Sequence, residues 1–186
     1  MRYTPQHKAE TRARLLQSAA KAAKRSGIAA ASVDSIAQDA GISGGGIYHH
    51  FTSKHELFAE AIAQDLERSL LTRLTRSPSL TVDKLLSGLG QYLTAEHVEN
   101  IEGGCPIPTL SADLARAEVP VKQNFELWMS ELHNAWAEVL GDPSLAWGVL
   151  SQSVGALMLA RLMGPGGARQ DVLSGNLMDL RDRLCQ

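Results

Sequence analysis

The chain of 186 residues predicts an all-α fold of about nine helices. Apolar residues recur at three- and four-residue spacing along most of it, and the strict alternation of a half-buried strand is absent. Segments rich in Gly, Pro and Ser separate these helical stretches at positions 77–79, 103–106, 141–143 and 164–167. We therefore expect a small helical head followed by a larger helical body.

Three helices are expected in the N-terminal part. The first runs from about Thr4 or Pro5 to Arg25. The second begins after Ser32, a favourable N-cap, and ends before Gly41, where a left-handed residue suits a helix end. The third follows Ser43, another possible cap. Two short helices joined by a tight turn form a helix-turn-helix, a motif whose second helix commonly enters the major groove of DNA.

A longer helix is expected to connect this motif to the rest of the chain. It begins with a Ser-x-x-Glu capping box at Ser53 and Glu56 and carries an apolar stripe to about Arg76. The predicted domains are a DNA-binding head at 1–52, with its motif at 32–51, a connecting helix at 53–76 and a body at 77–186. Body helices are expected near 82–98, from Pro106, from Pro120 to Leu140, at 144–163 and at 171–184.

The charge distribution favours contact between the head and phosphate. The net charge is −2, but residues 1–55 hold eight Lys/Arg against three Asp/Glu, and the remainder holds ten against seventeen. A basic end on an acidic body suits a DNA-binding protein, although chance clustering on solvated helices gives the same pattern. The acidic body argues against a non-specific DNA-packaging protein, because such proteins are usually basic throughout.

The motif resembles the tetracycline-repressor (TetR) family. The resemblance is carried by Ser32-Val33, Ile36-Ala37, Ala40-Gly41-Ile42-Ser43, Ile47-Tyr48, His50-Phe51 and Ser53-Lys54. It is specific over residues 8–75 and extends to the helical pattern beyond. It implies a homodimer that binds a palindromic double-stranded DNA operator and whose body binds a small molecule that tilts the connecting helix. We therefore expect a ligand-responsive transcriptional regulator that acts as a repressor.

The DNA contacts that the resemblance implies lie around the third helix and the start of the fourth. They are Ser32, Ser43, Gly44, Gly45, Tyr48, His49 and Lys54. Lys54 falls in a first helical turn, where free backbone N–H groups also attract phosphate. Relatives usually place a longer polar side chain at the position of Gly44. Three successive glycines offer no side chain to base edges, which predicts either close backbone approach with shape readout or a helix that DNA orders.

Aromatic residues and histidines in the body suggest a site for a small hydrophobic or aromatic effector. The candidates are Tyr92, His97, Phe125, Trp128, Met129, His133 and Trp136. The same spacing is also typical of core packing, so a purely structural role is the alternative for each residue.

A thiol sensor is the alternative mode of regulation. Cys105, between Gly104 and Pro106, is expected at a helix N-terminus, where backbone N–H groups stabilise a thiolate. The Gly-Cys-Pro segment resembles that of a TetR subgroup, some of whose members sense electrophiles or oxidants. A single cysteine is also often a small buried hydrophobe.

The last two helices are expected to form the dimer interface as a four-helix arrangement of two copies. The candidate residues are Leu150, Gly155, Leu157, Leu159, Met163, Leu173, Leu177 and Leu180. Core packing within one chain would explain part of this stripe.

Other classes of protein find little support. The chain has no Walker loop, HExxH motif, paired-cysteine spacing or nucleophile elbow, so we expect no enzyme, no cofactor and no metal site. Polar residues interrupt the apolar stretch 145–163, and the N-terminus lacks a signal peptide, so no membrane partner is expected. Two cysteines without a disulfide framework fit the cytoplasm.

Overall fold

A computed structural model describes residues 4–185, and helices make up all the regular structure of that part. The all-α prediction is confirmed. The head consists of α1 (Pro5–Ser26), α2 (Val33–Asp39) and the 3-10 helix η1 (Gly44–His49). A broken connection follows, α3 (Lys54–Arg68) and α4 (Leu70–Thr75). The remaining helices are α5 (Val82–Tyr92), α6 (Ala95–Glu99), α7 (Pro106–Ala115), α8 (Val119–Leu140), α9 (Pro143–Arg161) and α10 (Gly167–Leu184).

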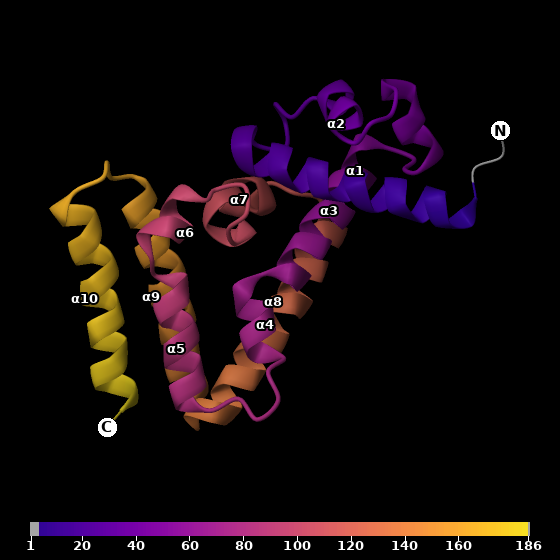
Figure 1. Ribbon diagram of the computed structural model, residues 1–186. Helices are drawn as coiled ribbons and strands as arrows, with labels where there is room; N and C mark the ends of the chain where they lie inside the picture. The colour runs from indigo at the N-terminus through magenta and orange to yellow at the C-terminus, as the bar shows by residue number, and fades with distance from the viewer. Residues whose placement is uncertain (1–3, 186) are drawn as a thin grey trace.

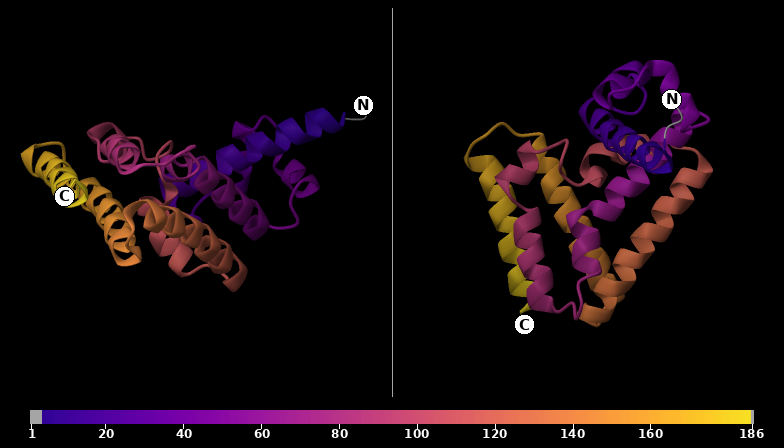
Figure 2. Two further views of the ribbon diagram at one scale, coloured as in Figure 1. Left: turned by 90° about the horizontal axis from the view of Figure 1, so that it is seen from below. Right: turned by 45° about the vertical axis from the view of Figure 1, so that its right-hand side comes forward.

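The head lies at one end of the body, over α7 and the adjoining end of α3, and α10 lies at the opposite edge (Figures 1 and 2). Helix α1 packs along both α2 and α3. Within the body, α9 packs between α8 and α10. Helix α9 is long and apolar enough to cross a membrane by length and composition, a property that core helices of soluble proteins share.

The helix ends of the head follow the expected chemistry. Gly27 and Gly41, with φ of 79° and 75°, take the positive backbone angles that favour glycine. The Ser32 Oγ accepts from the Ser35 N–H at 3.3 Å and caps α2. Ile47 and Phe51 are buried beneath the motif, as predicted. Ser43 precedes η1 but its side chain makes no capping hydrogen bond, so the cap expected there is wrong.

The connecting helix expected at 53–76 is two helices, and that prediction is wrong in this respect. Ser69 has extended backbone angles and its Oγ accepts from the Thr72 N–H at 3.2 Å, so it caps a new helix. The Thr72 hydroxyl donates to the Leu66 carbonyl at 2.6 Å and thereby satisfies an acceptor at the end of α3. The apolar stripe continues across the break, with Leu66 and Leu71 both buried. Because the apolar stripe continues through Ser69, the sequence pattern did not indicate that this residue caps a new helix.

The helix expected at 82–98 is also interrupted. Helix α5 ends at Tyr92, and Thr94 caps α6 by accepting from the His97 N–H at 3.1 Å. The expected start at Pro106 and the end at Gly141 are both confirmed. The final helix begins at Gly167, four residues earlier than predicted.

Candidate DNA-binding head and cavities of the body

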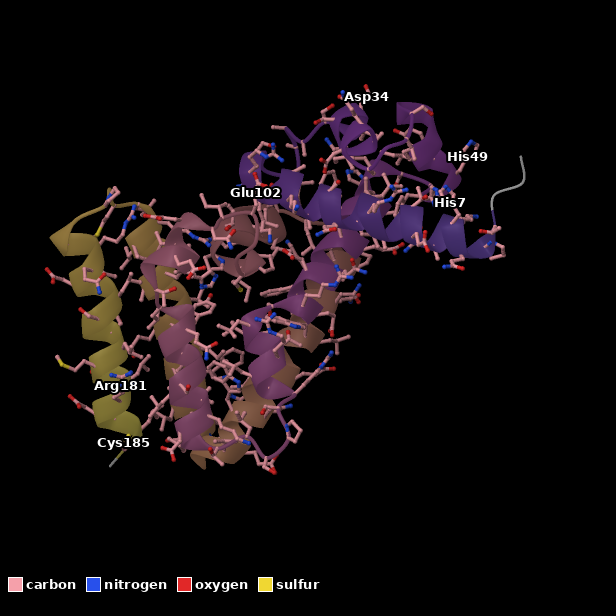
Figure 3. The ribbon with its side chains drawn as sticks, viewed as in Figure 1. His7, Asp34, His49, Glu102, Arg181 and Cys185 are labelled. Atoms are coloured by element: carbon pink, nitrogen blue, oxygen red, sulfur yellow. The ribbon has the colours of Figure 1, made fainter. Side chains whose placement is uncertain are left out.

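The helix-turn-helix lies on the side of the head away from the body (Figure 1). Asp34 and His49 project from this outer side, whereas Glu102 lies at the junction with the body (Figure 3). Tyr48 is 57% exposed, and Ser32, Ser43 and Gly45 are exposed as well. The arrangement leaves this face free for a duplex.

The three glycines form the first half of η1, so their backbone is folded into 3-10 turns in the free protein. None of the three has a positive φ. Gly44 lies against the Asp34 side chain, which a Cβ at position 44 would displace, whereas nothing lies within 4 Å of a Cβ at Gly45. A carboxylate next to Gly44 disfavours phosphate locally, and the backbone is the principal surface that this turn offers to DNA.

Lys54 is turned toward the head. Its Nζ donates to the Ala29 carbonyl at 3.0 Å and lies 5.7 Å from the centre of the Phe58 ring. The ammonium thereby fixes the loop between α1 and α2. A phosphate contact by Lys54 stays a prediction and would share the ammonium with this bond.

Polar contacts fasten the C-terminal end of α1 to the body. Buried Lys24 places its Nζ 2.7 Å from the Asp65 carboxylate and donates to the Gly104 carbonyl at 3.0 Å. The Ile28 N–H donates to Asp113 Oδ1 at 3.2 Å. An ion pair of 3.1 Å joins Arg25 to Glu102. The segment before α7 is therefore hydrogen-bonded and ion-paired directly to α1.

A first cavity, here called the apolar cavity, lies between α3, α7 and α8 and has a volume of about 230 Å³. It is lined by Ala59, Ile62, Ala63, Leu66, Glu67, Leu114, Val121, Asn124, Phe125, Leu127, Trp128 and Glu131. Two of the predicted effector residues, Phe125 and Trp128, belong to it, with ring centres 5.9 Å apart. The Trp128 Nε1–H donates to the Thr72 hydroxyl at 3.0 Å. One wall of the cavity is therefore hydrogen-bonded to the break between α3 and α4.

The other predicted effector residues lie elsewhere. Tyr92 and Trp136 are wholly buried in the core, and Met129 packs partly against it. His133 stacks on Trp147 with ring centres 4.2 Å apart, between α8 and α9. The seven residues thus do not form a single site. Spacing along α8 could not distinguish the cavity wall from the core, because Trp128, which lines the cavity, lies on the same buried stripe as Leu132 and Trp136.

His97 joins α5 to the start of α7. Its Nδ1 lies 2.7 Å from the Tyr92 carbonyl, and its Nε2 accepts from the Cys105 N–H at 2.9 Å. These partners assign the neutral tautomer with the proton on Nδ1. Burial is the main cause that lowers the pKa of His97, with the Arg161 and Lys24 charges acting in the same direction.

Cys105 occupies the N-cap position of α7, as expected, but it is buried and not exposed to solvent. Burial raises the pKa of the Cys105 thiol. A reactive thiolate needs the reverse, a lowered pKa and access to solvent. The site therefore favours a packed thiol over a sensor, and Cys185 is exposed next to the C-terminus.

The residues predicted for the dimer interface divide into two groups. Leu150, Leu157, Leu173 and Leu180 are buried by contacts within one chain, so a role in the interface does not explain them. Leu159 is 52% exposed, and Gly155, Met163 and Leu177 are partly exposed. The same region also exposes Leu162, directly after α9, and three apolar residues that were not predicted: Trp147, Met158 and Met178. This surface is available to a second copy.

A basic helix-turn-helix head joined by a broken helix to a helical body defines a class of protein, the DNA-binding regulators. Residues 15–61 match the family of bacterial regulatory proteins, tetR family, so the head is similar to the helix-turn-helix head of that family.

Curated relatives match about a third of the chain. The HTH-type transcriptional regulator UidR of Escherichia coli K12 is 42% identical over 60 residues, which are 32% of this chain and 31% of UidR. The chain thus aligns with about a third of the length of the curated relatives it matches.

Solved structures share the whole fold. A TetR transcriptional regulator from Chloroflexus aurantiacus has a TM-score of 0.79 and 22% identity, with 97% of each chain covered. The reduced form of NemR from E. coli gives 0.77 at 18% identity, covering 92% of this chain and 95% of NemR. GusR from Salmonella enterica gives 0.67 at 20% identity, covering 95% and 96%.

Proposed function

We propose that the chain is a ligand-responsive transcriptional repressor of the TetR family. It binds a palindromic operator as a homodimer and leaves the DNA when a small hydrophobic or aromatic molecule binds the body. The family match over residues 15–61 supports the DNA-binding half of this proposal. The observation that carries the regulatory half is the hydrogen bond from Trp128, in the apolar cavity, to Thr72 at the break between α3 and α4.

The break between α3 and α4 is the place where a bound effector would change the angle between the two helices. A ligand changes the position of the heads only if it binds one arrangement of the protein more tightly than the other. An aromatic molecule against Trp128 alters the ring that holds Thr72, and Thr72 in turn holds the end of α3 at Leu66. Helix α3 leads directly into the head, so a change of angle at Ser69 changes the distance between the two heads of a dimer.

The lining of the apolar cavity limits the chemistry of the effector. Lysine, arginine and histidine are absent from it, and the ionisable residues on its wall are Glu67 and Glu131. Glu67 is paired with Arg76 at 2.5 Å. Apolar and aromatic surface with carboxylates at the edge favours an uncharged or basic aromatic molecule and disfavours an acid.

The test is to fill the cavity. Val121→Trp places a large side chain where the effector would bind, and the variant should still bind operator DNA but no longer be released by an aromatic effector found by thermal-shift screening. Val119→Trp is the matched control, because Val119 is exposed on the same helix and does not line the cavity. Fluorescence anisotropy of a labelled operator measures both properties. Equal release of the two variants would contradict the proposal.

A further inference from the structure

A second cavity, here called the polar cavity, lies beside the break, on a different face of α3 from the apolar cavity. It has a volume of about 340 Å³. The α3–α4 side contributes Arg68, Ser69 and Arg73, and α5 and the segments after it contribute Gln91, Thr94 and Asn100. None of the residues predicted for DNA binding lies here, and of the predicted effector residues only His97 does.

The two arginines are available to a ligand. In the part of the chain that the structure describes, neither guanidinium forms an ion pair or a side-chain hydrogen bond, and both side chains are exposed. The Asp65 carboxylate at the cavity wall is already paired with Lys24. Glu96 is the other carboxylate of the lining. Two guanidinium groups facing one space are suited to a carboxylate or phosphate, which they bind through forked hydrogen bonds.

The remaining polar groups suit hydroxyls. Gln91 and Asn100 are exposed side-chain amides, and each can both donate and accept. The Thr94 hydroxyl already accepts from His97 N–H and is 3.4 Å from the Gln91 carbonyl. Amides at the edge of an arginine pair match a ligand whose anion is attached to a hydroxylated body.

The floor of this cavity is the segment that holds the head. Gly103, Gly104 and Cys105 line it, and the Gly104 carbonyl accepts the hydrogen bond from Lys24 of α1. The Gly104 N–H donates to the Asn100 carbonyl at 2.8 Å, and a side chain at Gly104 would collide with the His97 ring. The segment is therefore tightly packed. A ligand bound against it contacts residues that are themselves hydrogen-bonded to Lys24 of α1.

We propose that the polar cavity is a binding site for a small hydroxylated oxyanion, such as a sugar phosphate, which Arg68 and Arg73 hold by its charge. A ligand bound in the polar cavity alters the hydrogen bond between the Lys24 ammonium and the Gly104 carbonyl. This change alters the affinity of the head for DNA. The effect on DNA rests on the proposed function, whereas the binding site itself does not.

Binding is tested by isothermal titration calorimetry of the full chain with three probes: glucose 6-phosphate, inorganic phosphate and glucose. We expect saturable binding of glucose 6-phosphate, weaker binding of phosphate and none of glucose. The double variant Arg68→Gln/Arg73→Gln should bind glucose 6-phosphate at least about tenfold more weakly, because it removes both positive charges and their charge-assisted hydrogen bonds to the phosphate. Arg76→Gln is the matched control, an exposed arginine on the same segment outside this cavity, and should bind as the wild type does.

The outcomes separate the parts of the proposal. No saturable heat with glucose 6-phosphate, or unchanged affinity in the double variant, overturns the site. Equal affinity for phosphate and glucose 6-phosphate overturns the role of the amides. Operator anisotropy that does not respond to a ligand shown to bind overturns the link to α1. A chain that binds no DNA refutes the proposed function, while the calorimetry still decides whether the site exists.

Discussion

At the scale of single residues, Gly44 limits the side-chain contacts that the proposed DNA-binding face can make. It lies beside the Asp34 side chain and within a 3-10 turn, so this position presents backbone and a nearby negative charge to a duplex. Backbone groups position a protein on DNA but read little of the sequence. We therefore expect modest discrimination between bases and a strong dependence on DNA shape.

Gly44→Arg should raise the affinity of the head for DNA. The φ at this position is not positive, and Asp34 is exposed and able to rotate away, so the new side chain fits without backbone strain. One added phosphate contact steepens the dependence of log affinity on log salt by about 0.9. Gly167→Arg adds the same charge in the open space at the start of α10 and is the control. Anisotropy titrations at several salt concentrations measure the slope, and an unchanged slope would count against the docking of η1.

His97 shows how one side chain makes the body sensitive to pH. Its two ring nitrogens are matched to the Tyr92 carbonyl and the Cys105 N–H only while the ring is neutral, because protonation would place two donors face to face. Its folded pKa is lowered, so below pH of about 6.5 the unfolded chain takes up the proton first. Stability is present above that pH and falls as the solution is acidified toward the folded pKa.

His97→Asn should flatten this dependence. The urea midpoint of the wild type should fall between pH 7.5 and pH 5.5, and the midpoint of the variant should fall less. Part of the decline should persist, because burial also lowers the pKa of His50. His133→Asn removes a partly exposed histidine outside this network and is the control. If both variants lose stability with acid as the wild type does, His97 is not the responsible group.

Helix caps and left-handed turns were the features that the sequence predicted best. Ser32, Gly27 and Gly41 act where their local preferences indicate, because caps and left-handed turns depend on neighbouring backbone alone. The burial of Cys105 was not predictable in this way. Its environment is made by Tyr92 and His97, which reach it only after α5 and α6 have folded back.

At the scale of elements, the break between α3 and α4 is the feature on which the proposed regulation depends. The threonine hydroxyl groups of α4 accept hydrogen bonds from the tryptophan indole N–H groups of α8. Trp128 donates to Thr72 and Trp136 donates to Thr75 at 3.1 Å. Two tryptophans thus hold the short helix α4 in place, and only the first of them lines the apolar cavity.

Thr72→Val should destabilise the protein by about 1–3 kcal/mol, because it leaves the buried Trp128 indole N–H without its acceptor, while the Leu66 carbonyl still accepts from the Ser69 N–H. A double-mutant cycle with Trp128→Phe should give a coupling energy of about 0.5–3 kcal/mol by urea unfolding. The variant should also respond more weakly to the effector. Thr75→Val is the comparison: it should lose stability yet keep the response, since Trp136 lies outside the cavity. A coupling energy near zero would refute the link.

The spacing of apolar residues predicted which segments are helical. It did not predict where a helical segment is interrupted. The patterns at 53–76 and 82–98 each predicted one helix where two are found. Ser69 and Thr94 are the caps responsible, and both stand within stretches whose apolar period continues on either side. Whether such a residue interrupts a helix depends on partners from elsewhere, and Trp128 lies far along the chain from Thr72.

At the scale of the whole molecule, α9, α10 and the turn between them expose large apolar side chains. Leu162 is 83% exposed, Met178 is 64% exposed and Leu159 is 52% exposed. Exposed apolar patches often mark an interface with another protein, and we propose a second copy of this chain as the partner. A second copy that packs the same two helices against these residues would place two heads on one side of the dimer, as a palindromic operator requires.

Leu162→Glu should shift the chain from dimer to monomer, because it places a charge in an apolar contact. Sedimentation velocity at micromolar concentration should show the change in mass, and operator affinity should fall with it. Val119→Glu alters a similarly exposed residue on α8 and should leave the dimer intact. A dimer that persists in the Leu162 variant would place the interface elsewhere.

The central claim, that this chain reads palindromic DNA as a dimer, is tested most directly by selecting bound duplexes from a random pool with the purified full chain. We expect enrichment of a palindrome with two half-sites, and loss of that enrichment for the Leu162→Glu variant. A pool that remains random after selection, or a single half-site bound equally well by both proteins, would contradict the account.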